Sequence, residues 1–281
     1  MIELGLIGYP LGHSMSPRLH ESALRSCGLD GHYSLFPIPP EDKQGLKELL
    51  ARVRNGEISG LNVTIPHKQN VIELLDELTP TAKAIGAVNT IYRQDDKLIG
   101  ENTDAPGFLS DLKRFLTTEP QSHRELSGLV FGAGGSARAV VYALLNDGWE
   151  LTIAARRIDQ IQQLLQSFSN HNLQTTDLAL SNIDPSNIVL LVNTTPIGMT
   201  PNIDRSPWPE NVAFPPRAVV YDLVYNPHET KLVRDACSQG RAATTGLGML
   251  IDQAALAFEI WTGHKPSREI MLEAVNQATR S

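Results

Sequence analysis

Short apolar runs alternate with helix-like segments along the chain, and this order predicts an α/β protein. Strands are expected over residues 4–8, 33–38 and 61–65, and helices over residues 18–27 and 41–55. In the second of these helices the apolar residues recur every three or four positions and share one face. Because most strands are followed by a helix, we expect strands joined by crossover connections.

The pattern continues less regularly towards the middle of the chain. It predicts a helix reaching residue 78, a strand over residues 86–92 and a hairpin partner over residues 97–100. A helix over residues 105–116 and a polar run over residues 117–124 follow, and we interpret them as a bridge between two domains. The proline-rich stretch that includes Trp208 and Phe214 reads as an ordered surface loop.

The second half of the chain repeats the strand and helix alternation. Strands are expected over residues 150–155, 188–193 and 218–224, the last taken as the final strand of this part, and helices over residues 229–239, 251–262 and 267–278. We expect the final helices to return to the first domain, because chain ends often lie close together. The predicted domains are residues 1–103 with 241–281, and residues 104–240.

A glycine-rich turn joins an apolar run to a helix pattern in the second domain. Its spacing, Gly132-x-Gly134-x-x-Ala137, fits the dinucleotide-binding fingerprint, in which amides at a helix N-terminus approach a pyrophosphate. The alternative is a glycine-bearing turn without a ligand. Arg156 and Arg157 end the next strand, where an acidic residue would favour NAD, so the pair favours the 2′-phosphate of NADP. The alternative is a solvated arginine pair that opens a helix.

Composition and charge exclude several classes of function. The 281 residues carry a formal net charge of -7 with dispersed lysines and arginines, so we expect no nucleic-acid partner. Cys27 and Cys237 have no metal-ligand spacing, which predicts reduced thiols and no metal site. No secretory signal and no membrane-spanning run is recognisable, so we expect a cytoplasmic protein without a membrane partner.

Several polar side chains are expected at the ends of elements in the first domain. Ser14 and Ser16 lie in a strand-to-helix loop, where hydroxyls could bind a carboxylate, although Ser16 before Pro17 also reads as a helix cap. Lys68 follows the strand that Pro66 ends, and the alternative is a solvated lysine. Asp104 reads as a helix cap as well. Lys68 and Asp104 would form an acid-base pair if the fold brings them together.

Seven stretches taken together resemble the shikimate dehydrogenase family. They are residues 12–17, 62–68, 86–90 and 102–104, the Gly132 loop, residues 222–227, and residues 246–250 with Gln253. The stretches run the length of the chain in the family's order, which is far more specific than the glycine loop alone. The implied fold is an N-terminal α/β substrate domain and a doubly wound, Rossmann-type dinucleotide-binding domain, with C-terminal helices returning to the first domain.

The resemblance also implies an activity and a set of site residues. The activity is the NADP-linked interconversion of 3-dehydroshikimate and shikimate in aromatic biosynthesis, with Lys68 and Asp104 as catalytic pair. The substrate would be held by Ser14, Ser16, Thr64, Asn89, Asp104, Tyr225 and Gln253. The cofactor would be held by Gly132, Ala133, Gly134, Gly135, Ser136, Ala137, Arg156 and Arg157, with Leu223, Gly246 and Met249 near the nicotinamide. The partner is a small molecule, and a homodimer is compatible with the sequence.

Two departures and two alternatives qualify the resemblance. Asp104-Ala105-Pro106-Gly107 replaces the family's Asp-Gly-x-Gly, which puts the helix start in question, and Ala155-Arg156-Arg157 replaces Asn-Arg-Thr. One alternative is a dehydrogenase of broader range that prefers quinate or accepts both acids, although serine at position 16 resembles the shikimate-selective members. The other is an NADP(H)-binding sensor without catalysis.

Overall fold

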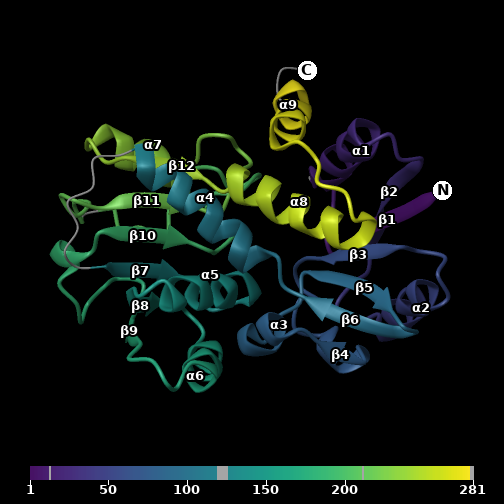
Figure 1. The fold of residues 1–281 in the computed structure, drawn as a ribbon. Coiled ribbons are helices and arrows are strands. Elements are labelled where there is room, and N and C mark those ends of the chain that lie inside the picture. The colour runs from purple at the N-terminus through teal and green to yellow at the C-terminus, as the bar shows by residue number, and fades with distance from the viewer. Residues whose placement is uncertain (13, 119–125, 211, 279–281) are drawn as a thin grey trace. The chain divides into compact units, whose positions relative to one another are not determined.

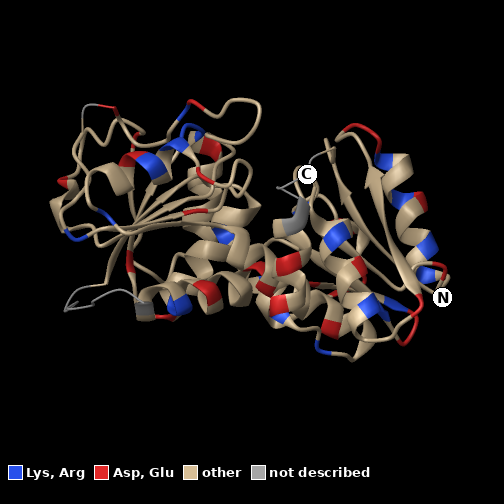
Figure 2. Ribbon diagram, turned by 90° about the horizontal axis from the view of Figure 1, so that it is seen from above, with Lys and Arg blue, Asp and Glu red and all other residues tan. Residues whose placement is uncertain are grey.

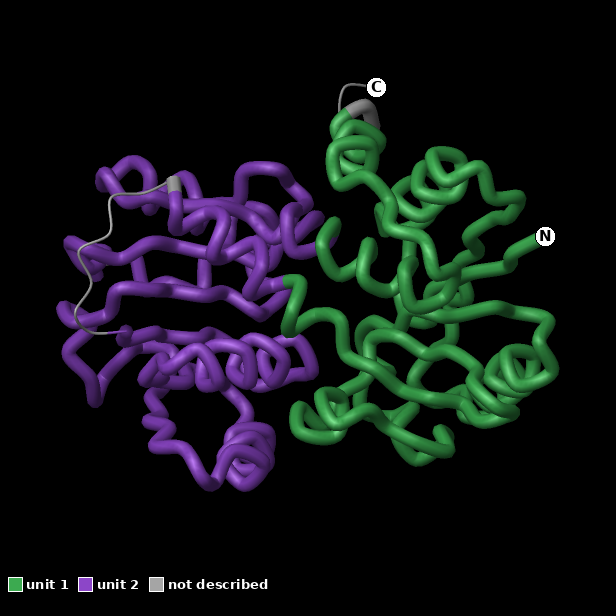
Figure 3. The backbone as a smooth tube through the Cα atoms, in the orientation of Figure 1, with its two compact units in different colours: residues 1–107, 251–281 green, residues 108–250 purple. Residues whose placement is uncertain are grey.

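The computed structural model describes residues 1–12, 14–118, 126–210 and 212–278, and the chain divides into two compact units (Figure 3). Unit 1 comprises residues 1–107 and 251–281, and unit 2 comprises residues 108–250. Both crossings fall inside helices, α4 (Asp104–Thr118) and α8 (Leu247–Thr262). The division therefore lies several residues after the boundaries expected from the sequence, because a helical pattern that runs through a crossing carries no boundary signal.

Unit 1 is built on a six-stranded mixed sheet in the order β2-β1-β3-β5-β6-β4 (Figure 1). Its elements are β1 (Ile2–Gly8), α1 (Ser16–Ser26), β2 (Gly31–Pro37), α2 (Lys43–Arg54), β3 (Gly60–Val63), β4 (Glu77–Leu78), α3 (Pro80–Ile85), β5 (Thr90–Gln94), β6 (Lys97–Glu101) and α9 (Arg268–Ala278). β1 and β3 are parallel, whereas β5 is antiparallel to both β3 and β6. The carboxyl ends of β1, β3 and β6 and the amino end of β5 therefore share one edge.

The helices of unit 1 form where the pattern predicted them. In α2 the buried leucines and Val53 face an apolar core that also includes Leu61 and Ile91, and the Asp42 carboxylate caps the helix by accepting from Gly45 N at 2.8 Å. α9 packs against α1, and α8 from Ile251 onward lies in this unit. The prediction that the C-terminal helices return to the first domain is thus confirmed.

The segment between Lys68 and β5 corrects the predicted helix and strand. Instead of one helix reaching residue 78, the chain forms a 3-10 turn at Ile72–Leu74, then β4 and α3. Pro80 opens α3 and Thr79 caps it, so the helix signal belongs after Leu78, which pairs with Gly100 of β6. Gly86, with φ +67°, ends α3. The predicted strand over residues 86–92 therefore begins only at Thr90.

Unit 2 contains a six-stranded parallel sheet in the order β12-β11-β10-β7-β8-β9. Its elements are β7 (Ser127–Phe131), α5 (Gly135–Asn146), β8 (Glu150–Ala154), α6 (Ile158–Ser167), β9 (Gln174–Thr176), a 3-10 turn (Pro185–Asn187), β10 (Leu190–Asn193), β11 (Val219–Asp222), α7 (Lys231–Ser238) and β12 (Ala243–Thr245). The strand order reverses between β7 and β10, which is the doubly wound arrangement predicted for this part.

Two strands of unit 2 were missed by the hydrophobic pattern. β9 and β12 are three residues each, contain mainly Gln, Thr and Ala, and occupy the two edges of the sheet. β12 follows β11 and pairs with it, so the expectation that the strand over residues 218–224 is the last one was wrong. Such short edge strands contain no apolar run that would identify them in the sequence. They are extended because they pair with the neighbouring inner strand of the sheet.

The proline-rich loop of unit 2 is tied down by its aromatic residues, as predicted. Trp208 stacks on Phe214 with ring centroids 4.9 Å apart, and meets Phe131 edge to face at 6.3 Å. Both loop aromatics are buried in the core that contains Leu129 and Leu191. The predicted polar bridge over residues 117–124 lies outside the described residues beyond position 118.

Candidate active site

Lys68 and Asp104 meet at the shared edge of the unit 1 sheet. Lys68 follows the carboxyl end of β3 and Asp104 follows the carboxyl end of β6, so the antiparallel strand β5 between them places both at one edge. Lys68 Nζ donates to Asp104 Oδ2 at 2.6 Å, and the two side chains are only 11% and 6% exposed. An ion pair this enclosed is held in one geometry and is weakly screened by salt.

Asn89 completes the arrangement around the carboxylate. Its Nδ2 donates to Asp104 Oδ1 at 2.9 Å and lies 3.3 Å from Gln253 Oε1. Its Oδ1 accepts from Thr103 N at 2.7 Å, which fixes the orientation of the amide. The backbone supports this position, because Val88 N donates to Lys68 O at 2.7 Å. One side chain from each of four segments therefore converges on one point.

The helix-cap interpretation of Asp104 is corrected by its neighbour. α4 begins at Asp104 itself, and Asn102 Oδ1 accepts from Ala105 N at 3.2 Å, which is the bond that a capping side chain would make. Asp104 thereby keeps both carboxylate oxygens for Lys68 and Asn89. Pro106 lies in the first turn, where no amide donor is needed, so the departure from the family's sequence is accommodated.

Gly107 matches the last glycine of the family's Asp-Gly-x-Gly, and the structure requires a glycine at this position. A Cβ placed on it would lie 2.7 Å from Gln253 N and 2.9 Å from Gln253 Cβ. The start of α4 and the unit 1 part of α8 consequently pack backbone to backbone at this point. This contact brings Gln253 within reach of Asn89.

Ser14 lies in the loop after β1 and Ser16 is the first residue of α1, at the same edge. Ser14 Oγ accepts from Ser16 N at 3.3 Å, and Met15, without a capping side-chain bond, precedes α1. The capping role that the sequence favoured for Ser16 is therefore wrong, and the local backbone bond belongs to Ser14. Thr64 follows β3 nearby, and Tyr9 N donates to Ile65 O at 2.9 Å, which ties the two loops together.

Tyr33 and Asn62 form a buried polar pair behind these loops that the sequence reasoning missed. Tyr33 Oη donates to Asn62 Oδ1 at 2.8 Å, and Asn62 Nδ2 donates to Asn89 O at 3.2 Å. Burial raises the pKa of the Tyr33 phenol well above its usual value. The signal was present in Asn62, a polar residue in a strand of which every residue is buried.

The glycine loop has the geometry of an anion-binding turn. Gly132 adopts φ +114°, and a Cβ there would lie 2.4 Å from Thr194 Oγ1, so the position requires glycine. A Cβ on Gly134 would meet nothing within 4 Å, which leaves open space beside the first turn of α5. The cap residue of α5 offers no side-chain acceptor, so the helix N-terminus can receive a phosphate oxygen.

Arg156 and Arg157 lie beside this loop, because Phe131 of β7 pairs with Ala154 of β8. Both arginines are exposed, and neither side chain bonds to another residue in the described part of the chain. Figure 2 shows charges of both signs interspersed over each unit. An anion at this turn would therefore be bound by a few local groups rather than by a face of one charge.

The remaining residues of the prediction follow β11 and β12. Leu223 and Tyr225 follow Asp222, whose buried carboxylate accepts from Thr230 Oγ1 at 2.6 Å, Asn193 Nδ2 at 2.8 Å and Val224 N at 3.0 Å. Burial raises the pKa of Asp222 to about 6, against the effect of these bonds. The pKa of Tyr225 is also raised by burial. These bonds hold the turn that carries Leu223 and Tyr225.

The predicted substrate residues thus belong to two units. Ser14, Ser16, Thr64, Lys68, Asn89, Asp104 and Gln253 lie in unit 1, whereas Tyr225 lies in unit 2 together with every predicted cofactor residue. Within unit 1 three hydrogen bonds join four of the predicted residues directly, namely Lys68, Asn89, Asp104 and Gln253.

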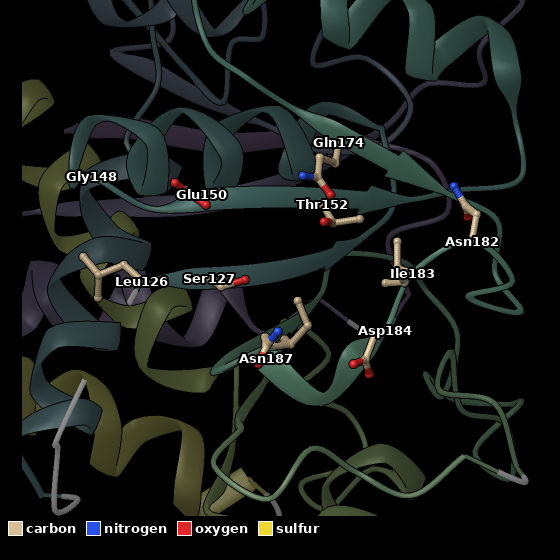
Figure 4. A pocket seen from close by; sticks show the side chains of 11 residues that line it. Leu126, Ser127, Gly148, Glu150, Thr152, Gln174, Asn182, Ile183, Asp184 and Asn187 are labelled. Atoms are coloured by element: carbon tan, nitrogen blue, oxygen red, sulfur yellow. The ribbon is translucent and has the colours of Figure 1, made fainter. Parts of the chain in front are cut away.

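Unit 2 contains a cavity of about 790 Å³ (Figure 4). Its lining includes Ser127 and Glu150, the first residues of β7 and β8. It also includes Asp184, which precedes the 3-10 turn before β10, and Asn187, which ends that turn. The glycine loop and the arginines follow the opposite ends of the same strands. In the described ranges, no group of three or more metal-ligating side chains and no helix long and apolar enough to cross a membrane is found.

Comparison with known proteins places these features in a family context. Residues 6–91 match the model of the shikimate dehydrogenase substrate binding domain, and residues 246–275 match that of the shikimate 5'-dehydrogenase C-terminal domain. Over 273 residues, 97% of both chains, the chain is 38% identical to a shikimate dehydrogenase (NADP(+)) of Shouchella clausii.

Solved structures agree with this match. A shikimate 5-dehydrogenase from Thermus thermophilus, in complex with NADP(H) and shikimate, is 38% identical with a TM-score of 0.86, covering 99% of this chain and 100% of that one. A quinate dehydrogenase from Corynebacterium glutamicum, in complex with NAD, is 31% identical with a TM-score of 0.86, covering 98% of this chain and 99% of that one.

Proposed function

The chain belongs to the shikimate dehydrogenase family, and we propose that Lys68 and Asp104 are the catalytic pair with which it interconverts 3-dehydroshikimate and shikimate. The enzyme is an NADP-dependent oxidoreductase that acts on a CH-OH group. The observation that carries the proposal is the enclosed contact of 2.6 Å between Lys68 Nζ and Asp104 Oδ2 at the edge where the strands of unit 1 end. A solvated lysine would have no such partner.

The chemistry requires a proton donor at the carbonyl oxygen. In the direction of reduction, the carbonyl carbon gains a hydride and the oxygen gains a proton, so the C=O double bond becomes a C–OH single bond. Bound NADPH supplies the hydride. Lys68 donates a proton from its ammonium group to the oxygen, becomes neutral and is reprotonated from solvent. Asp104 orients the ammonium group and accepts from an adjacent substrate hydroxyl, and Asn89 holds Asp104 in place.

The other site residues take the roles that the resemblance implies. Ser14 and Ser16 would bind the substrate carboxylate, and Thr64, Asn89, Tyr225 and Gln253 would bind its hydroxyl groups. The glycine loop, residues 132–137, would receive the pyrophosphate, and Arg156 and Arg157 the 2′-phosphate. Support comes from the open space at Gly134, the uncapped start of α5 and the two arginine side chains, which have no partner among the described residues.

Steady-state kinetics of Lys68→Ala and Asp104→Asn test the catalytic pair. Proton-transfer catalysis is typically worth about a hundredfold to ten-thousandfold, so each change should lower kcat by that order while the Kd for NADPH stays within about twofold. The matched control is Lys83→Ala, which removes an exposed lysine of α3 in the same unit. It should keep the kcat of the unchanged protein.

A double variant separates a joint role from two separate ones. Because Asp104 orients the ammonium group of Lys68 and the two act as one unit, Lys68→Ala with Asp104→Asn should lose much less than the product of the two single losses. Near-normal kcat in Lys68→Ala would return the residue to the interpretation as a solvated lysine. It would also revive the alternative of an NADP(H)-binding sensor without catalysis.

The quinate alternative rests on the structural match to a quinate dehydrogenase. We propose shikimate as the preferred acid, because serine at position 16, which is buried, resembles the shikimate-selective members of the family. The assay of the unchanged protein with both acids decides between them. A kcat/KM for quinate equal to that for shikimate would replace the proposal by an enzyme of broader range.

Three further expectations concern the two units, the location of the protein and its oligomeric state. We assign substrate binding to unit 1 and cofactor binding to unit 2, since the predicted residues separate in this way apart from Tyr225. A cytoplasmic location is supported by the biosynthetic reaction of the family. A homodimer stays a prediction, which light scattering of the purified chain would test.

A further inference from the structure

We infer that Asp111 is a positioning residue for the nicotinamide end of the cofactor site, and that it acts through the backbone of Gly248. The inference rests on the proposed function, in which Leu223, Gly246 and Met249 lie beside the nicotinamide. All the residues that carry it belong to unit 2. Asp111 itself touches neither substrate nor cofactor in this proposal.

Asp111 is a buried carboxylate in α4 with directional partners. The residue is 8% exposed, Tyr221 Oη donates to its Oδ2 at 2.6 Å, and Arg114 Nη1 donates to its Oδ1 at 2.9 Å. Tyr221 lies in β11, is fully buried, and meets Phe108 edge to face at 5.1 Å. The carboxylate is therefore held at one place between α4 and the central sheet.

The carboxylate lies directly against the second residue of α8. A Cβ placed on Gly248 would be 2.0 Å from Asp111 Oδ1 and 2.2 Å from both Asp111 Cγ and Oδ2. No side chain fits there, so the backbone of α8 approaches α4 as closely as a glycine permits. The amides in the first turn of a helix carry partial positive charge, which favours a carboxylate at this position.

The same segment is packed from a second side by Leu223. A Cβ on Gly246 would lie 2.4 Å from Leu223 O and 2.8 Å from Leu223 Cα. Gly246 is thus packed against Leu223 and Gly248 against Asp111, and Met249 is only 6% exposed. Leu223, Gly246 and Met249 are the three residues proposed beside the nicotinamide, so Asp111 determines how far this group can move.

The position of residues 246–249 should affect the rate of hydride transfer more than the affinity for NADP. The pyrophosphate and 2′-phosphate contacts proposed for residues 132–137, Arg156 and Arg157 involve other segments and would keep most of the NADP affinity. Displacement of reacting atoms by about 1 Å can cost about a hundredfold in rate. Loss of the Asp111 contact should therefore slow the chemical step while the KM for shikimate stays nearly unchanged.

The test compares three variants in the full-length enzyme. Asp111→Asn keeps the shape of the side chain and removes its charge, and Tyr221→Phe removes one donor to the carboxylate without changing Asp111. Asp147→Asn is the matched control. Asp147 pairs at 2.6 Å with Lys113 of α4, the helix that contains Asp111, but it has no contact with α8 among the interactions described. Single-turnover rates are measured with shikimate, and with shikimate deuterated at the carbon that is oxidised.

We expect Asp111→Asn to lower the hydride-transfer rate about tenfold to a hundredfold, to raise the deuterium isotope effect on kcat, and to leave the KM for shikimate within about twofold. Tyr221→Phe should change the same quantities in the same direction by less. A residue that only stabilises the fold would lower the melting temperature without moving the isotope effect. If Asp111→Asn and Tyr221→Phe both keep the single-turnover rate of the Asp147→Asn control, the inference is overturned.

The outcome remains separate from that of the proposed function. If the unchanged protein oxidises no shikimate with NADP, the proposed function fails and no variant is informative about it. If the unchanged protein is active and the Asp111 and Tyr221 variants behave like the control, only the positioning role fails. If Asp111→Asn does not fold, the Tyr221→Phe result decides alone.

Discussion

His20 is a fully buried imidazole in α1. Its ring stacks on Tyr33 with centroids 4.4 Å apart and planes 1° apart, and Phe258 and Trp261 lie on its other sides at 6.3 and 5.4 Å. Burial lowers the pKa of His20 from 6.5 to about 3, so the ring is neutral in the folded protein at pH 7. Asp222 in unit 2 shows the opposite shift, because burial raises its pKa from 3.8 to about 6.

These two groups predict opposite contributions to stability below neutral pH. Between pH 3 and 6.5 the unfolded chain binds a proton at position 20 that the folded chain does not, so the stability contributed by neutral His20 is complete above pH 6.5 and is lost as pH falls towards 3. Between pH 3.8 and 6 the folded chain binds the extra proton at Asp222, so its contribution falls as pH rises. Each slope is about 1.4 kcal/mol per pH unit.

We therefore expect the free energy of unfolding, measured by urea titration between pH 4.5 and 5.5, to change slope in opposite directions in two variants. His20→Phe should make it rise less with pH than in the unchanged protein, and Asp222→Asn should make it rise more. Phe258→Leu is the control for lost packing beside His20, and it should lower stability equally at each pH. Parallel curves for all the proteins would contradict these pKa shifts.

At the scale of elements, we expect the turn between β8 and α6 to determine the preference between NADP and NAD. Arg157 is the N-terminal cap residue of α6, and Arg156 precedes it, separated from the end of β8 by Ala155. Both guanidinium groups are exposed beside a helix N-terminus. A 2′-phosphate placed there would accept charge-assisted hydrogen bonds from arginine and experience the favourable end of the helix dipole.

We expect Arg156→Ala combined with Arg157→Ala to narrow the preference for NADP over NAD. Charge-assisted bonds contribute about 1.5 to 3 kcal/mol each, so kcat/KM for NADP should fall roughly tenfold to a hundredfold per good contact, while that for NAD changes little. Arg217→Ala removes the same charge at the other end of the unit 2 strands, before β11, and should keep the preference. Equal efficiency with both cofactors in the unchanged protein would contradict the role of the pair.

At the scale of the whole molecule, each ligand should protect its own unit. A ligand at a hundred times its Kd stabilises the state that binds it by about 2.7 kcal/mol. In hydrogen exchange read by mass spectrometry, NADP alone should slow exchange mainly in peptides from residues 108–250, and shikimate alone mainly in peptides from residues 1–107 and 251–278. Protection of unit 1 by NADP and of unit 2 by shikimate would contradict the assignment of the two units.

The sequence by itself determined the class of the fold, most long elements and the chemistry of the candidate site. Apolar periodicity identifies α2 and the inner strands because burial of one face is a local property of the pattern. The glycine loop is recognisable for another local reason. The turn needs φ +114° at Gly132, which constrains the residue type at that position. From the residues alone, without the family resemblance, Lys68 and Asp104 were predicted as a pair only on the condition that the fold joins them.

The tertiary structure decided what depends on neighbours distant in the chain. β9 and β12 are extended because β8 and β11 offer them backbone partners, which no pattern in three polar residues reveals. Asn102 rather than Asp104 makes the capping bond, and Lys68 meets Asp104 because β5 runs antiparallel between their strands. The contacts of Asp111 and His20 could not be predicted from the sequence either, because one depends on the approach of α8 and the other on the stacking of Tyr33 of β2. Contacts of this kind arise from packing, and packing is not periodic along the sequence.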